Sequence, residues 1–225
     1  MESKAKKGKA KVLIVDDHPI VRQGVGQLIN QEADLMVCAE AETASDALKA
    51  IAAHQPDVAV VDLSLKGVSG LELIKDIKVR FPTLPVLVLS MFDETIYAER
   101  VLRAGARGYM MKEEATQKVL MAIRRVLNGE IYLSDAMASH LLSVITTGAK
   151  DGKTSPVDLL SDRELEVFQL IGEGLGTSQI ARKLHLSPKT IETYRAHIKE
   201  KLNLESATEL LQHAIQWTQG LGGMS

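Results

Sequence analysis

Five polar residues whose side chains suit phosphoryl chemistry are spread through the first half of the chain. Asp16 and Asp17 follow one apolar run, and Asp62, Ser90 and Lys112 end or follow three later ones. A carboxylate can attack phosphorus directly, and clustered carboxylates favour a bound Mg²⁺. A lysine and a hydroxyl complement the oxygens of an incoming phosphoryl group. These residue types predict a phosphoryl-transfer site with Asp62 as nucleophile, provided that the fold brings them together.

Apolar runs and amphipathic stretches alternate through this part of the chain. The runs are rich in β-branched residues, which is typical of strands buried on both faces. The expected strands are 11–16, 36–40, 58–61, 86–90 and 108–111, and the expected helices are 20–30, 44–54, 70–80, 94–104 and 115–128. Five such pairs predict an α/β doubly wound, five-stranded parallel sheet. Because parallel strands share their carboxyl edge, all five polar residues are expected at the edge where such sheets bind ligands.

The rest of the chain is expected to be helical. A helix is predicted over 134–147, and a polar segment with Gly and Pro over 148–157 reads as a linker. Further helices are predicted at about 162–173, 178–185, 188–202 and 206–217. Ser161 and Glu164 have the spacing of a capping box, and Ser187 followed by Pro188 is a typical helix start.

Composition excludes several classes of protein. The chain has 225 residues, of which 45% are hydrophobic, so it is not disordered as a whole. A single cysteine excludes an internal disulfide, and no zinc-ligand spacing surrounds it, which fits a reducing cytoplasmic compartment. The sequence has no run of about 18 apolar residues, so no membrane span is predicted. The net charge is −2, so any contact with DNA must come from a local basic patch.

Two other enzyme classes fit the residues poorly. A phosphatase of the haloacid-dehalogenase type also uses a strand-end aspartate and Mg²⁺, but it has a second aspartate where this chain has Ser64. A dinucleotide-binding enzyme needs a glycine-rich turn after the first strand, and here the strand runs into Asp16, Asp17, His18 and Pro19.

Residues 11–130 resemble a response-regulator receiver domain, whose acidic pair, phosphoacceptor aspartate, Ser/Thr and Lys match Asp16, Asp17, Asp62, Ser90 and Lys112. The resemblance implies Mg²⁺ held by Asp17, Asp62 and the backbone carbonyl of Ser64, with Asp16 acting through water. It also implies that Tyr109, three residues before the lysine, is the switch aromatic. The chain departs from the family at Glu113, where proline is usual, and at Met91, where many receivers have a small residue that leaves the pocket accessible.

Residues 159–217 resemble the LuxR-type helix-turn-helix of the NarL/FixJ class. The match lies in Leu160, Arg163, Glu164, Val167, Gly174, Ile180, Ala181, Leu184, Ser187, Thr190, Ile191, Ile198, Lys201 and Leu202. The resemblance implies that the helix over 188–202 enters the major groove of DNA. The expected DNA-binding residues are Lys189, Thr190, Glu192, Thr193, Tyr194, Arg195, Ala196, Lys199 and Lys201, with Tyr194 standing where the family commonly has histidine.

Charge in the second part of the chain is concentrated on one element. Residues 157–225 hold 7 Lys and Arg against 9 Asp and Glu, yet the expected recognition helix is basic. Binding is therefore expected to be modest, salt-sensitive and helped by dimerisation. The last helix, over 206–217, either pairs two DNA-binding domains through residues such as Leu210, Leu211, Ala214 and Trp217 or contributes them to the core.

Together the two resemblances imply a two-component response regulator rather than an enzyme with a separate substrate. A sensor histidine kinase would phosphorylate Asp62 with Mg²⁺, and the phosphoryl group would control DNA binding and transcription. Double-stranded DNA, a second copy of the phosphorylated chain and RNA polymerase are the further partners considered. The alternative is a constitutive DNA-binding regulator with an unphosphorylated receiver. The predicted domains are a basic tail over 1–10, a receiver over 11–130, a connecting helix and linker over 131–157, and a helix-turn-helix domain over 158–220.

Overall fold

The structure, a computed structural model, describes residues 8–147 and 156–222. The chain divides into two compact units between Leu141 and Leu142, and each unit is considered by itself. The division falls inside the segment predicted to connect two domains. Most of the predicted basic tail (1–7) and of the predicted linker (148–155) lies outside the described residues. The exact domain limits remain predictions.

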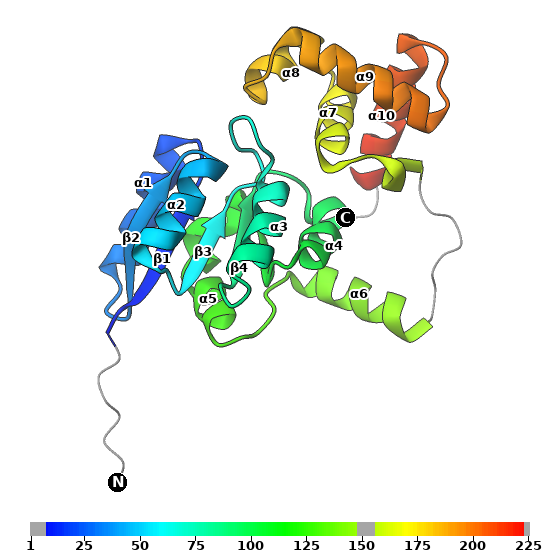
Figure 1. Cartoon of the computed structure of the whole chain (residues 1–225). Helices are drawn as coiled ribbons and strands as arrows, with labels where there is room; N and C mark the ends of the chain where they lie inside the picture. The colour runs from blue at the N-terminus through cyan, green and yellow to red at the C-terminus, as the bar shows by residue number, and fades with distance from the viewer. Residues whose placement is uncertain (1–7, 148–155, 223–225) are drawn as a thin grey trace. The chain divides into compact units, whose positions relative to one another are not determined.

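The first unit is a parallel five-stranded sheet with helices on both faces (Figure 1). Its strands are β1 (Ala10–Val15), β2 (Leu35–Ala41), β3 (Val58–Val61), β4 (Val86–Ser90) and β5 (Gly108–Met111). They lie in the order β2-β1-β3-β4-β5, which is the flavodoxin-like order and confirms the predicted fold. The direction of winding reverses between β1 and β3, so a crevice opens at the carboxyl ends of these two strands.

Two layers of helices cover the sheet. Helices α1 (Pro19–Gln31) and α5 (Ala115–Leu127) pack together on one face. Helices α2 (Ala44–His54), α3 (Gly70–Arg80) and α4 (Glu94–Ala104) lie side by side on the other. A short 3-10 turn, Lys112–Glu114, joins β5 to α5. Every element matches its predicted range to within two residues.

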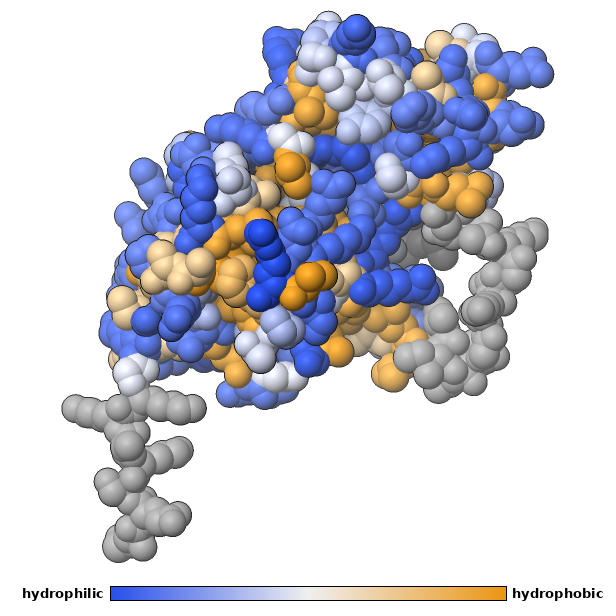
Figure 2. Space-filling view, in the orientation of Figure 1, coloured by the Kyte–Doolittle hydropathy of each residue, from blue (hydrophilic) through white to orange (hydrophobic). Residues whose placement is uncertain are grey.

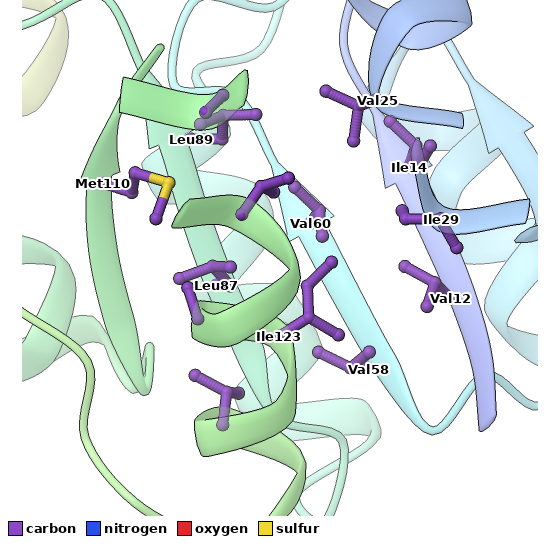
Figure 3. Packing of buried hydrophobic residues seen from close by; sticks show 14 of the residues in the cluster. Val12, Ile14, Val25, Ile29, Val58, Val60, Leu87, Leu89, Met110 and Ile123 are labelled. Atoms are coloured by element: carbon purple, nitrogen blue, oxygen red, sulfur yellow. The ribbon is translucent and has the colours of Figure 1, made fainter. Parts of the chain in front are cut away.

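The core on the α1 and α5 face consists mainly of branched aliphatic side chains. In Figure 3 side chains of α1 and α5 point toward those of the strands. The strand residues in this cluster are at most 2% exposed, which explains why the strands read as continuous apolar runs. The labelled members are Val12, Ile14, Val25, Ile29, Val58, Val60, Leu87, Leu89, Met110 and Ile123.

After α5 the chain returns to the open edge of the sheet. Tyr132 forms a single parallel bridge with Gly108. Its carbonyl accepts a hydrogen bond from the backbone N–H of Tyr109 at 2.9 Å. The next helix, α6 (Asp135–Thr147), begins after Ser134, whose backbone N–H donates to Oε1 of Glu94 at 3.0 Å. The start of α6 is thereby attached to β5 and to the first residue of α4.

After the end of α6, the second unit contains four further α-helices among its described residues. They are α7 (Asp162–Gly172), α8 (Thr177–Lys183), α9 (Pro188–Leu202) and α10 (Ala207–Gly222), preceded by a 3-10 turn at Pro156–Leu159. Helix α8 ends two residues before its predicted end, because His185 turns the chain with a left-handed φ of 53°. Helix α10 extends five residues beyond the predicted 217.

Helix α10 completes the core of this unit. Leu210 and Ala214 are fully buried, and the Trp217 ring packs against Phe168 of α7 with centroids 5.5 Å apart. Leu210 and Ala214 therefore belong to the core of this unit, and the partly buried Trp217 contributes one side of its ring to that core. Leu211, which is 40% exposed, is the member of the predicted set that remains on the surface.

The surface carries both polar and apolar residues. Figure 2 shows hydrophilic residues over most of the visible face, with apolar side chains exposed between them. Within the described ranges no helix is both long and apolar enough to cross a membrane.

Candidate functional site

Three aspartates meet at the crevice between β1 and β3. Asp16 and Asp17 directly follow β1, and Asp62 directly follows β3. They are 2%, 6% and 2% exposed, respectively. One carboxylate oxygen from each, together with a ring nitrogen of His18, lie within 4.8 Å of one another. The topology thus brings together the carboxylates that the sequence placed on separate strands.

Lys112 supplies the positive charge of this cluster. Its Nζ atom lies 2.7 Å from Oδ2 of Asp16 and 2.7 Å from Oδ2 of Asp62. The Lys112 side chain is 7% exposed, and burial by itself would lower its pKa. The charges and hydrogen bonds of the two aspartates outweigh that effect and raise the pKa of Lys112. The lysine is therefore held as a cation in the site.

The ionised form of the Asp62 carboxyl group is disfavoured by its surroundings. Burial raises the pKa of its carboxyl to about 6, opposed by Lys112 and reinforced by the charge of Asp16. Among the described residues its buried Oδ1 atom has no hydrogen-bond partner. An oxygen without a partner, beside two further carboxylates, fits a hard divalent cation such as Mg²⁺. The residues present therefore suit the metal that the resemblance implies.

Ser90 and Tyr109 lie next to each other beside the carboxylate cluster. Ser90 ends β4 and is fully buried, and its Oγ accepts a hydrogen bond from the backbone N–H of Phe92 at 3.2 Å. The Tyr109 hydroxyl donates to the carbonyl of Phe92 at 2.7 Å and is fully buried. Burial raises the pKa of Tyr109, and a hydrogen bond with Ser90 opposes the shift. Tyr109 is therefore directed into the unit, with its hydroxyl at the β4–α4 loop.

The remaining predicted positions of the first unit, Ser64, Met91 and Glu113, lie in the loops and turns around the aspartate cluster. Ser64 is partly buried in the loop after β3, where its backbone hydrogen-bonds the Asp62 carboxylate and lowers the pKa of that group. Met91 is 61% exposed, so its side chain does not fill the space beside Ser90. Glu113 lies in the 3-10 turn that carries Lys112, showing that the turn forms without proline.

Two residues that sequence reasoning missed contact the acidic pair. Nδ1 of His18 lies 2.8 Å from Oδ1 of Asp17, and the His18 backbone N–H donates to Oδ1 of Asp16 at 2.8 Å. Arg22 of α1 is buried, and one of its terminal nitrogens donates to the carbonyl oxygen of Asp16 at 2.6 Å. Arg22 had a recognisable signal, because it occupies the same helical stripe as Val25 and Ile29.

In the second unit, helices α8 and α9 form a helix-turn-helix. Ser187 caps α9 by accepting from the backbone N–H of Thr190 at 3.0 Å, with Pro188 in the first turn, as predicted. The capping box of α7 is also confirmed, since Ser161 and Glu164 exchange hydrogen bonds. Ile191 and Ile198 are fully buried, which fixes the opposite face of α9 toward solvent.

The predicted DNA-binding residues differ in exposure and in the contacts that they already make. Lys189, Glu192, Thr193 and Ala196 are exposed on α9, and Thr190, Tyr194, Arg195 and Lys199 are partly buried. Glu192 accepts a hydrogen bond from the Thr177 hydroxyl of α8 at 2.6 Å. Nζ of Lys201 lies 2.6 Å from Oε2 of Glu164 in the α7 capping box. That contact favours a structural role for Lys201, and the DNA contacts remain predictions.

Two family models match the chain. The response regulator receiver domain matches residues 12–124, and the family of bacterial regulatory proteins called luxR matches residues 158–214. The chain is a two-component response regulator. As in other members of its class, the NarL/FixJ class, the receiver domain precedes the luxR-family DNA-binding domain.

Relatives of this response regulator align with most of its length. The oxygen regulatory protein NreC of Staphylococcus epidermidis is 37% identical over 92% of this chain and 97% of its own length. The protein of that name from Staphylococcus carnosus is 39% identical over 92% and 97%.

Solved structures agree with this assignment. RcsB of Salmonella typhimurium superimposes with a TM-score of 0.64 at 30% identity, covering 93% of this chain and 98% of that one. RcsB of Salmonella enterica serovar Typhimurium, bound to the promoter rprA in the presence of the phosphomimetic BeF3⁻, superimposes with a TM-score of 0.59 at 31% identity, covering 92% and 98%.

Proposed function

We propose that this response regulator accepts a phosphoryl group on Asp62 from a sensor histidine kinase in the cytoplasm, and that the phosphorylated form binds DNA more tightly. The observation that carries the proposal is the surroundings of Asp62. Its carboxylate is buried between Asp16, Asp17 and Lys112, and its Oδ1 atom lacks a hydrogen-bond partner among the described residues. A carboxylate placed in this way is costly unless a cation or an incoming group uses it.

Asp17, Asp62 and the carbonyl of Ser64 would hold Mg²⁺, with Asp16 linked through water. When bound, the metal would neutralise charge that develops on the phosphoryl oxygens. An oxygen of Asp62 forms the new bond to phosphorus, and the bond from phosphorus to the imidazole nitrogen of the kinase breaks. The electron pair of that bond stays on the imidazole. Lys112 stabilises the oxygens of the transferred group. The receiver domain catalyses only its own phosphorylation and dephosphorylation.

Ser90 and Tyr109 would report the phosphoryl group to the rest of the chain. A phosphoryl oxygen would compete for the Ser90 hydroxyl, which accepts from the Phe92 backbone N–H, while the Tyr109 hydroxyl donates to the carbonyl of the same residue. The Tyr109 backbone N–H donates to Tyr132, two residues before the residue that caps α6. A local change at Ser90 therefore reaches the start of the segment that leads to the DNA-binding domain.

Helix α9 would enter the major groove of double-stranded DNA. Lys189, Arg195 and Lys199 suit phosphates, whereas Glu192, Thr193 and Ala196 suit base edges. One solved RcsB structure holds two dimers bound to DNA, which supports a homodimer as the DNA-binding form of this chain. RNA polymerase is the further partner to expect if the regulator activates transcription.

Beryllium fluoride with Mg²⁺ tests the control of DNA binding, because the complex mimics an acyl phosphate. Affinity for duplex DNA and molecular mass in solution are measured with and without it, on the wild type and on Asp62→Ala. Tighter binding or dimerisation of the wild type alone supports the proposal. Equal affinity and mass under all conditions would favour the constitutive alternative.

A further inference from the structure

An arginine lies where helix α1 faces the sheet. Arg22 is 8% exposed and shares its stripe of α1 with the buried residues Val25, Gly26 and Ile29. Lysine and arginine are seldom buried unless they are paired. A buried Arg22 in an apolar stripe is therefore expected to have polar partners that hold its guanidinium group in place.

That partner is the backbone between the two acidic residues. Nη1 of Arg22 donates to the carbonyl oxygen of Asp16 at 2.6 Å. The peptide group that joins Asp16 to Asp17 is planar, so fixing its carbonyl also fixes the direction of the Asp17 N–H and the position of the Asp17 Cα atom, from which the side chain projects. The Asp16 backbone N–H donates to the carbonyl of Ala41 at 3.1 Å. The acidic pair is therefore held from both sides of its backbone.

The guanidinium group is itself oriented by two glutamates. Nη2 of Arg22 donates to Oε1 of Glu42 at 2.7 Å, and Nε lies 3.4 Å from Oε2 of Glu40. Oε2 of Glu42 lies 3.6 Å from Nζ of Lys66, which belongs to the loop that follows Asp62. The contacts thus join the loop after β1 to the loop after β3.

These contacts also limit how Arg22 can act. Two carboxylates already balance its charge, so Arg22 adds little net positive potential at the aspartates. The planar fork of an arginine can meet a carbonyl and a carboxylate in fixed directions at the same time, whereas a lysine presents one point charge. Orientation is therefore the property that Arg22 supplies.

We propose that Arg22 is a positioning residue, which orients the Asp16–Asp17 backbone so that the acidic pair can bind Mg²⁺. The inference rests on the proposed function, because it deepens the account of the same site. Residues that orient metal ligands typically change metal affinity about 10–100-fold when they are replaced.

The test compares Arg22→Lys and Arg22→Met with Arg124→Met in the full-length protein. Arg124 of α5 is a matched control, because it also joins two parts of the receiver by ion pairs. Its partners, Glu32 and Asp34, follow the carboxyl end of α1 and are not members of the aspartate cluster. The measurements are the Mg²⁺ dissociation constant by calorimetry, the thermal unfolding midpoint, and the rate of phosphorylation by acetyl phosphate.

We expect Arg22→Lys to raise the Mg²⁺ dissociation constant by about tenfold and Arg22→Met by up to about 100-fold. Arg124→Met should lower the unfolding midpoint and leave the dissociation constant unchanged. Saturating Mg²⁺ should restore most of the phosphorylation rate of Arg22→Lys. If Arg22→Met does not fold, Arg22→Lys decides the question alone.

An unchanged Mg²⁺ affinity in a folded Arg22→Lys protein would overturn the inference and leave the proposed function intact. An equal loss of affinity in Arg124→Met would also overturn it, because the effect would then follow general stability. If the wild type itself neither binds Mg²⁺ nor accepts a phosphoryl group, the proposed function fails first and the inference fails with it.

Discussion

The Nζ atom of Lys112 lies 2.7 Å from Oδ2 of Asp62, although the two residues are 50 positions apart in the chain. The contact spans the carboxyl ends of β3 and β5, on either side of β4. It puts a buried cation beside the carboxylate of the proposed phosphoryl acceptor. An ammonium group this close to the carboxylate can stabilise charge on the oxygens of a phosphoryl group transferred to it.

Removing this cation should slow phosphorylation more than it unfolds the protein. We expect Lys112→Met to lower the rate with acetyl phosphate by about 10²–10³-fold, the usual effect of losing one donor that stabilises transition-state charge. Lys118→Met serves as the control, because Lys118 pairs with Glu114 on the surface of α5. A rate for Lys112→Met close to that of the wild type would contradict the role of Lys112.

Neutralising Asp62 should stabilise the metal-free protein. Burial raises the pKa of Asp62 to about 6, so the ionised carboxylate is unfavourable in the folded state at pH 7. We expect Asp62→Asn to increase the free energy of unfolding of the receiver by about 1–3 kcal/mol without Mg²⁺. The difference should shrink when Mg²⁺ is added. Calorimetric unfolding with and without Mg²⁺ measures both effects, and a less stable Asp62→Asn protein would refute the expectation.

Gly70 should tolerate no side chain. A Cβ atom at this position would lie 2.0 Å from the carbonyl oxygen of Asp62 and 2.7 Å from Cα of Leu63, so the backbone around the acceptor would have to move. We expect Gly70→Ala to cost about 2 kcal/mol or more and to reduce phosphorylation. Gly24→Ala in α1 is the matched control, since nothing lies within 4 Å of its Cβ. That control should gain about 0.5–1 kcal/mol.

The stability of the DNA-binding domain should depend on the contact between Glu164 and Lys201. Burial opposes the ionised form of Glu164, but hydrogen bonds from Lys201 and Ser161 outweigh it and hold the pKa of Glu164 below its ordinary value of 4.5. In the unfolded chain the pKa of Glu164 takes its ordinary value. The contact therefore stabilises the fold fully at pH values above that ordinary pKa, and the stabilisation is lost as the pH falls through the lower pKa of the folded state. Lys201→Met should cost about 0.5–1 kcal/mol at pH 7 and almost nothing near pH 3.

Trp217 gives a specific readout for this experiment. It is the only tryptophan of the chain and packs on Phe168 in the same domain. Its fluorescence should follow unfolding of the DNA-binding domain in the full-length protein. A penalty for Lys201→Met that is the same at pH 3 and pH 7 would show that the ion pair is not its cause.

Lys189 should contribute to DNA binding without regard to sequence. Its side chain is exposed on α9, and its charge would neutralise one phosphate. We expect Lys189→Ala to weaken binding to random-sequence duplex DNA and to reduce the slope of log affinity against log salt by about 1. Lys183→Ala, on α8 and paired with Glu173, is the comparison. An unchanged slope for Lys189→Ala would remove this residue from the DNA interface.

The sequence predicts the fold well because most of its signals are local. Continuous apolar runs mark strands covered on both faces, and helix caps such as Ser187 mark starts within one residue. The predicted helix over 178–185 extends two residues beyond the end of α8. The residue types around His185 do not indicate the left-handed backbone that follows the helix. The bridge formed by Tyr132 was not foreseen, because a single bridged residue has no periodicity.

The candidate site was predictable to the extent that its residues end strands. Asp16, Asp17, Asp62 and Ser90 each close a recognisable strand, so their meeting follows from parallel topology alone. Arg22 lies in a helix and acts through a backbone carbonyl, so strand-end reasoning passes over it. The contact of Lys201 with Glu164 joins positions 37 residues apart, and only packing of α7 against α9 brings them together.

Whether Asp62 accepts a phosphoryl group can be measured by incubation with acetyl phosphate and Mg²⁺, followed by intact-protein mass spectrometry. We expect the wild type to gain the mass of one phosphoryl group, chelation of Mg²⁺ to prevent the gain, and Asp62→Ala to gain none. A wild type that remains unmodified, or an Asp62→Ala protein that gains the same mass, would show that Asp62 is not the phosphoryl acceptor.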